Sequence, residues 1–198
     1  MGHLELYHIY VFVVVIVCWF VFAAAFLSRK RTPVSVVRKR DNSSFAGFAI
    51  QIIGFAFVWM LRRQLFTHIV EFPVAIEIAI AIYAIILAMA STIFLISSIR
   101  TLGKQWSVAA QTVERHELIT NGPYGVVRHP IYSGLLGMLI ATGLSMSRWE
   151  GLAAGIVLYT VGTFMRIRGE ERLMREAFGK EFEQYTQRVP SFIPFLHF

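Results

Sequence analysis

The sequence predicts an all-α integral membrane protein in which five transmembrane helices carry a cytoplasmic loop and an amphipathic C-terminal helix. Three observations predict this class. Hydrophobic residues make up 56% of the 198 residues and charged residues only 16%, against roughly 25% charged residues in a soluble domain. Five uncharged runs approach the length that a bilayer requires. The 19 Lys and Arg residues gather between those runs, which is typical of membrane topology and gives no support to a nucleic-acid partner.

Each of the five runs predicts one helix. A bilayer core requires about 20 apolar residues per helix, and the fifth run has only 15. Three residues join the last two runs, so these two are expected to form a helical hairpin. The first run lacks the basic start and the cleavage site of a signal peptide. In chain order the runs are Leu6–Ser28, Asn42–Leu61, Ile78–Ile99, Pro130–Ser147 and Gly151–Met165.

Basic residues set the predicted direction of the helices, because cytoplasmic loops carry the excess of Lys and Arg. The loop after the first run, the loop 100–129 and the tail hold 16 of these residues, whereas the opposite side holds Arg62, Arg63 and Arg148. The N-terminus is therefore expected outside and the C-terminus in the cytoplasm. The Arg62–Arg63 pair opposes this direction, and we interpret it as snorkelling to the interface. The small size and the absence of organelle signals favour a prokaryotic inner membrane.

The polar groups divide the chain into two parts. Residues 1–99 form three N-terminal spans with few polar side chains, and residues 100–198 hold nearly all of the groups capable of chemistry. Nucleotide-binding signatures are absent, since no Gly-x-Gly-x-x-Gly follows a strand and there is no Walker loop. His116 and His129 lack a third ligand nearby, and Cys18 is the only cysteine. No metal site is therefore predicted.

A loop rich in Gly, Pro, aromatic and His residues leads into the fourth run. Its most distinctive stretch is Asn121–Gly134, with the sequence NGPYGVVRHPIYSG. Pro130 suits the first turn of a helix, where its missing N–H is no loss. His129 then lies at the N-cap, beside backbone N–H groups that attract a carboxylate or another anion. A structured turn with Tyr and Trp at the headgroup level explains this stretch equally well.

A second polar cluster, Arg166–Glu171, follows the fifth run. That run spans roughly 22 Å of helix, so Arg166 is expected near the interface, where a charge usually marks a site or a pathway. If the helix continues, Arg166 and Glu170 share a face, although an ordinary helix salt bridge is the better explanation of this pair taken alone. The tail Glu170–Arg188 predicts one or two amphipathic helices interrupted by Gly179. Such a tail either covers a pocket built by the loop or lies passively on the membrane surface.

Together these motifs resemble a known family. The stretch Asn121–Gly134, preceded by His116-x-Leu118, resembles the signature of the isoprenylcysteine carboxyl methyltransferase family, as do Arg166-x-x-x-Glu170-Glu171 and the tail up to Val189-Pro190. The similarity covers about residues 100–194. It implies an integral membrane methyltransferase that uses S-adenosyl-L-methionine, held in a cytoplasmic pocket made by the loop, the ends of the last spans and the tail.

The resemblance also implies roles for individual residues. Arg166 would be the catalytic-site residue that contacts the substrate carboxylate, and Glu170 would contact the cofactor. The implied partner is a lipophilic small molecule or a prenylated substrate that arrives from the bilayer, and prokaryotes generally lack prenylated proteins, which favours a small lipophilic acid. The other implied cofactor contacts are Gln111, His116, Glu117, Leu118, Ile119, Tyr124, His129, Pro130, Ile131 and Tyr132.

The residues are consistent with methyl transfer to a carboxylate. A carboxylate with a pKa near about 4 is ionised at neutral pH, so the reaction requires positioning and no general base. Arg166 would hold the acceptor by a bidentate pair, and Tyr124 and Tyr132 would face the sulfonium of the cofactor. Three alternatives stay open: a phospholipid-type N-methyltransferase, an NADPH-dependent sterol-type reductase and a non-catalytic membrane scaffold.

Overall fold

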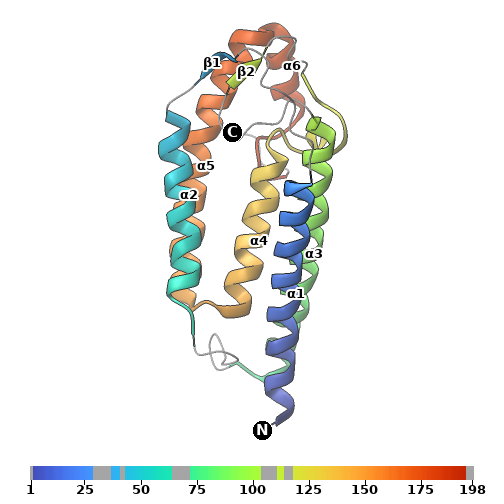
Figure 1. Cartoon of the computed structure of the whole chain (residues 1–198), viewed down its shortest axis with the longest axis vertical. Coiled ribbons are helices and arrows are strands. Elements are labelled where there is room, and N and C mark those ends of the chain that lie inside the picture. The colour runs from blue at the N-terminus through green and yellow to red at the C-terminus, as the bar shows by residue number, and fades with distance from the viewer. Residues whose placement is uncertain are drawn as a thin grey trace.

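The fold is an elongated bundle of long helices, seen here in a computed structural model that describes residues 2–28, 37–40, 43–63, 72–103, 111–113 and 118–194. The elements are α1 (Gly2–Leu27), β1 (Val37–Arg40), α2 (Ser43–Met60), α3 (Val74–Leu102), β2 (Gln111–Val113), the short 3-10 helix η2 (Gly122–Gly125), α4 (Pro130–Met146), α5 (Trp149–Phe178) and α6 (Lys180–Arg188). Figure 1 shows β1, β2 and α6 at one end of the bundle and the N-terminus at the other.

Within the described residues, every predicted span lies in a helix to within one residue at its ends. In the described chain, α1 and α3 are long and apolar enough to cross a membrane, while α2 and α4 are apolar but shorter. The fifth run opens α5, a helix of 30 residues that continues without a break into the tail. Large apolar side chains remain exposed along the bundle, for example Phe20 at 71% and Ile93 at 66%, as expected of a surface that faces lipid. The helical class is confirmed, and the number of spans stays a prediction.

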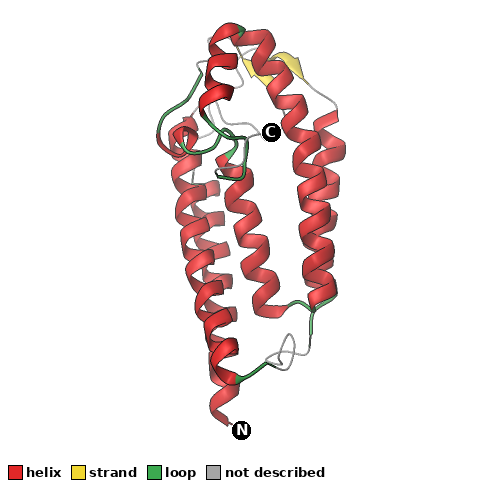
Figure 2. Cartoon of the chain, turned by 180° about the vertical axis from the view of Figure 1, so that it is seen from behind, coloured by secondary structure: helices red, strands yellow, loops and turns green. Residues whose placement is uncertain are grey.

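A small antiparallel sheet corrects the purely helical prediction. β1 and β2 pair with Val37 opposite Val113 and Arg40 opposite Gln111, and Figure 2 shows the pair at the end of the bundle, seen from behind. Both strands lie in segments predicted as loops. Their partners are far apart in sequence and each strand is very short, so no local alternation of apolar and polar residues indicated them.

Glycines let α2 and α5 approach closely. A Cβ atom at Gly162 would lie 2.5 Å from the carbonyl oxygen of Gly47, and one at Gly54 would lie 3.0 Å from that of Gly155. The glycines of each helix are seven residues apart, so they line one face of it. Small residues at such a seam allow backbones to pack tightly in a membrane, where the hydrophobic effect between helices is absent. Figure 1 shows α2 lying along α5.

α4 lies at the centre of the packing. One apolar cluster joins it to α1 and α3 through Val15, Leu95 and Met138. A second cluster joins it to α2 and α5 through Val58, Leu139 and Tyr159. Because α4 takes part in both clusters, the position of its first turn is fixed from two sides.

Arg63 has a structural role at the end opposite to β1, β2 and α6. Its Nε donates to the carbonyl oxygen of Ser147 at 3.1 Å, and its Nη2 donates to that of Leu144 at 2.6 Å. Its backbone N–H donates to Met146. These carbonyls end α4, and a cation there satisfies them and complements the helix dipole. Arg63 therefore has partners within the fold, and the direction of the helices stays a prediction.

The glycine seam gives a testable prediction. Gly162→Val should force α2 and α5 apart, because the added side chain meets the backbone of Gly47 and the side chain of Gln51. Overpacking of this kind costs about 1–3 kcal/mol, so the melting temperature in detergent should fall by at least about 3 °C. Ala153→Val is the matched control, since Ala153 is exposed on the same helix. Equal effects of the two changes would contradict a tight seam.

Candidate active site

α5 continues beyond the apolar run, so the charged residues that follow the run belong to the same helix. These residues include Arg166, Glu170 and Glu171. Arg166 Nη2 lies 3.7 Å from Glu170 Oε1, an ion pair between residues four apart. Glu171 follows on a neighbouring face of the helix, because successive residues are rotated by about 100°. The helix ends only at Gly179, whose φ of 51° suits glycine and starts the turn into α6.

His129 lies between the two carboxylates of α5. Its Nδ1 is 3.4 Å from Glu170 Oε2, and its Nε2 is 3.2 Å from Glu171 Oε1. His129 occupies the N-cap position of α4 as predicted, with Pro130 at the first helical position, but its side chain makes no capping hydrogen bond. The carboxylates therefore approach the ring of His129 and not the free N–H groups of the helix.

The geometry favours a protonated His129. A neutral imidazole donates from one nitrogen only, so one of the two carboxylates would face a lone pair, whereas the imidazolium donates to both. Burial by itself lowers the pKa of His129, but the hydrogen bonds and charges of Glu170 and Glu171 outweigh it and raise the pKa above its usual value. In return His129 helps to lower the pKa of both carboxyls against the effect of burial, that of Glu171 to about 2.

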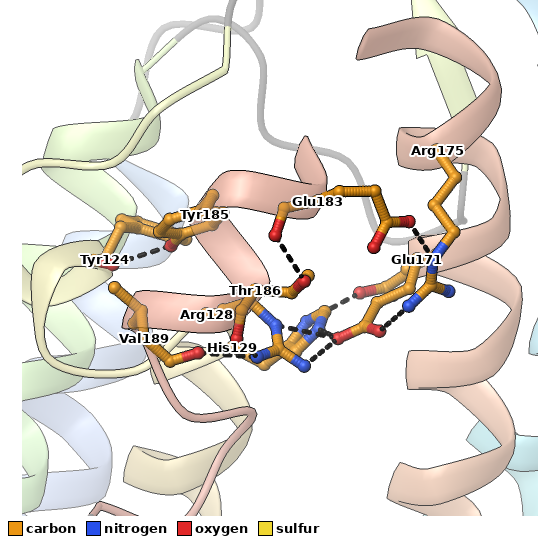
Figure 3. A network of polar contacts seen from close by, with 10 residues as sticks. Tyr124, Arg128, His129, Glu171, Arg175, Glu183, Tyr185, Thr186 and Val189 are labelled. Carbon is orange, nitrogen blue, oxygen red and sulfur yellow. Dashed lines mark hydrogen bonds and ion pairs between the residues drawn. The ribbon is translucent and has the colours of Figure 1, made fainter. Parts of the chain in front are cut away.

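Arg128 connects the polar cluster of His129, Glu170 and Glu171 to the segment that follows α6. Its Nε and Nη2 donate to Glu171 Oε1 at 2.9 and 2.7 Å, and its Nη1 donates to the carbonyl oxygen of Val189 at 2.5 Å. Arg175 pairs with the other oxygen of Glu171 at 3.2 Å and with Glu183 of α6 at 2.9 Å. Figure 3 shows this chain of contacts running from α5 through Arg128 to the end of α6.

α6 and the residues that follow it, up to Ser191, cover the loop before α4. The backbone N–H groups of Arg128 and His129 donate to the carbonyls of Pro190 and Ser191, each at 2.9 Å. The Tyr185 hydroxyl of α6 donates to the carbonyl of Tyr124 at 2.6 Å. Of the two predicted roles for the tail, the structure supports the one in which it closes over the loop.

Arg166 is buried between helices, with 6% of its surface exposed. Its guanidinium carbon lies 5.2 Å from the ring centre of Tyr132 and 5.3 Å from that of Phe48. Its Nη1 donates to Gln51 Oε1 at 3.4 Å. The Tyr132 hydroxyl donates to Glu170, so the aromatic ring, the cation and the carboxylate form one cluster.

Five of the predicted site residues meet in this region: Tyr124, His129, Tyr132, Arg166 and Glu170. Tyr124 is buried, and burial together with the charge of Glu170 raises the pKa of its hydroxyl.

The other predicted residues have different surroundings. Pro130 is fully buried at the start of α4, and Ile131 packs against the cluster of α1, α3 and α4. Leu118 and Ile119 are half-buried in the chain before η2. The backbone of Gln111 belongs to β2, while His116 and Glu117 lie outside the described residues.

Three residues of the cluster are not predicted from the sequence. Arg128 is one of the basic residues that predict the topology, although it belongs to the Arg-His-Pro stretch and is only 8% exposed. Glu171 is part of the Arg166-x-x-x-Glu170-Glu171 motif, but the motif assigns it no function. Gln51, a single buried amide in an apolar helix, was the available signal in the N-terminal half, because buried polar residues require partners.

Known proteins share the segment that carries this cluster. A family model described as phospholipid methyltransferase matches residues 79–181, more than half of the chain. The chain therefore belongs to the phospholipid methyltransferase family. "Protein-S-isoprenylcysteine O-methyltransferase B" of Arabidopsis thaliana is 32% identical over 103 residues, which cover 51% of this chain and 52% of that protein. "Cobalt-zinc-cadmium resistance protein CzcN" of Cupriavidus metallidurans is 38% identical over 102 residues, 49% of this chain and 45% of that protein.

A solved structure shares the fold. The eukaryotic intramembrane Ras methyltransferase ICMT, isoprenylcysteine carboxyl methyltransferase, matches with a TM-score of 0.56 and 22% sequence identity, over 78% of this chain and 52% of that chain. The chain spans about half the length of the curated relatives it matches. The resemblance inferred from the motifs is confirmed.

The protonated His129 predicts a pH-dependent stability. Its folded-state pKa lies above the unfolded value of about 6.5, so its stabilising contribution is full below about pH 6.5 and is lost as the pH rises through the folded-state pKa. His129→Gln cannot gain this charge. Its melting temperature in detergent should therefore fall below that of the parent near about pH 6 and approach the parent at higher pH. A difference that stays constant with pH would contradict an imidazolium at this position.

Proposed function

We propose that this chain is an S-adenosylmethionine-dependent methyltransferase that acts on a carboxylate of a lipophilic, isoprenylcysteine-like acceptor at the membrane. The observation that carries the proposal is the buried Arg166 guanidinium beside Glu170, inside the segment 79–181 that the phospholipid methyltransferase family model matches. A buried cation in a membrane protein usually serves a substrate or a pathway. The match covers only about half of each relative. The identity of the methyl acceptor is therefore proposed for this chain and is not taken from the relatives.

The protonation states of the cluster favour a carboxylate acceptor over an amine. An ammonium acceptor must lose a proton before it can attack a methyl group, which calls for a base with a pKa near neutral. Among the described residues of the cluster, Glu170 and Glu171 have lowered pKa values and His129 has a raised one. They are therefore poor bases at neutral pH. A carboxylate acceptor is already ionised and needs none.

Arg166 is suited to orient such an acceptor. Its guanidinium is planar and lies near two aromatic rings, which restrict its orientation. It already has a carboxylate, that of Glu170, within 3.7 Å. An acceptor carboxylate would find the same fork of N–H donors, and orientation of one oxygen toward the methyl group is the main contribution that the protein makes to an in-line displacement.

The residues around Arg166 also fit the cofactor. Glu170 offers ionised oxygens for ribose hydroxyls or for the amino group, and the ring of Tyr124 would offer an aromatic face to a cationic sulfonium. Tyr132, whose ring packs against Arg166 and His129, would border the cofactor through its hydroxyl beside Glu170. When bound, S-adenosylmethionine supplies a methyl group activated by that sulfonium. His129 and Arg128 keep Glu170 and Glu171 ionised and in place.

Substitution of Arg166 tests the proposal. Arg166→Lys keeps the charge but loses the planar fork, so methyl transfer to an isoprenylcysteine acid should fall about tenfold or more, which corresponds to about 1.4 kcal/mol of transition-state stabilisation. Glu170→Gln should instead weaken the binding of S-adenosylmethionine. Transfer is measured with labelled cofactor and the purified protein in lipid nanodiscs.

The controls separate the alternatives. Arg168→Lys is the matched variant, because Arg168 is exposed on the same helix, and it should behave as the parent. The methyl ester of the acid, which lacks a free carboxylate, should not be methylated. Transfer to phosphatidylethanolamine with no transfer to the acid would support the N-methyltransferase instead, and binding of NADPH in place of S-adenosylmethionine would support the reductase.

We further propose a multi-pass arrangement with five spans, the site in the cytoplasm and the N-terminus outside. The distribution of Lys and Arg supports this direction, and the N-terminus and the cluster lie at opposite ends of the bundle (Figure 1). A reporter fused after Phe198 should be cytoplasmic in a bacterial host, and one fused at Met1 should be external. A cytoplasmic Met1 would contradict five spans.

A further inference from the structure

Gln51 connects α2 to the cluster on α5. It is 5% exposed, its Nε2 donates to Thr163 Oγ1 at 2.8 Å, and its Oε1 accepts from Arg166 Nη1 at 3.4 Å. A guanidinium only donates hydrogen bonds, whereas a hydroxyl donates or accepts. The amide must therefore turn its oxygen to Arg166 and its nitrogen to Thr163, so the chemistry of the partners fixes its orientation.

The glycine seam makes room for this contact from both sides. A Cβ atom at Gly162 would lie 2.9 Å from Gln51 Cγ, and one at Gly47 would lie 2.7 Å from Arg166 Cγ. Each helix thus has a glycine where the other helix sends a long polar side chain across. Gln51 and Gly47 lie before residue 79, where the family match begins, so this part of the site belongs to the N-terminal half, which carries no motif.

We propose that Gln51 is a positioning residue for Arg166, which holds the guanidinium in the orientation that receives the acceptor carboxylate. Arg166 has many rotamers, and it has a competing carboxylate in Glu170 at 3.7 Å. A hydrogen bond from Nη1 to Gln51 holds one edge of the guanidinium toward α2 and limits its turn toward Glu170. The proposal rests on the proposed function, since it assumes that Arg166 binds the acceptor.

The proposal predicts an effect on the acceptor and none on the cofactor. Gln51→Leu keeps the approximate size and removes the amide oxygen, so the Kd of an isoprenylcysteine acid should rise about tenfold, the effect expected when a charged group loses a hydrogen bond in a buried site. Binding is measured by calorimetry in nanodiscs with S-adenosylhomocysteine present, which prevents turnover. The affinity for S-adenosylhomocysteine should change less than about twofold.

Two further variants exclude a merely structural role. Val58→Ala removes a fully buried side chain of α2 that belongs to the apolar cluster with Leu139 and Tyr159, so it lowers stability without touching Arg166, and it should leave acceptor binding unchanged. In an Arg166→Lys background, Gln51→Leu should have little further effect on acceptor binding, because residues that act through one contact are not additive.

The outcomes are distinguishable. If the parent does not bind the acid, the proposed function fails and the proposed role of Gln51 fails with it. If the parent binds the acid and Gln51→Leu binds it equally well, only the role of Gln51 is overturned. Equal losses in Gln51→Leu and Val58→Ala, or fully additive effects of Gln51→Leu and Arg166→Lys, would likewise overturn the positioning role.

Discussion

The ion pair between Arg128 and Glu171 holds together three segments at the end of the bundle that carries α6. Arg128 precedes α4, Glu171 lies on α5, and the same guanidinium reaches the backbone of the tail at Val189. Both side chains are buried, and a buried charge without a partner is strongly destabilising. The loop, the helix and the tail can therefore bury these charges only when all three are assembled, which makes the geometry of the cluster a consequence of this one pair.

The two adjacent carboxylates, Glu170 and Glu171, have different partners. Glu171 is occupied by Arg128 and Arg175, whereas Glu170, about 100° further back around the helix, faces Tyr132 and Arg166. His129 contacts both carboxylates and neutralises part of their mutual repulsion. Glu171 thus connects segments of the fold, whereas Glu170 lies beside the buried cation of Arg166. The arrangement suits a reaction that needs fixed charges and no proton acceptor.

The membrane-embedded part supports the cluster through close packing. Seam glycines bring α2 against α5, and α4 is held between two apolar clusters. Because lipid does not drive helices together as water does, association depends on such contact and on buried polar pairs like that of Gln51 with Thr163. The motif-free half of the chain is in this way part of the architecture around the candidate site, and the seam of glycines links the two halves.

The sequence alone determined the positions of the helices, because apolar runs and charges along the chain report directly on the bilayer. Pro130 at a helix start, the break at Gly179 and the shared face of Arg166 and Glu170 followed from local backbone rules. Only the tertiary structure decided which distant groups meet: β1 with β2, Arg63 with the end of α4, Arg128 with Glu171 and Gln51 with Arg166. Those contacts join residues up to 115 positions apart. They depend on how whole helices pack, which no local pattern encodes.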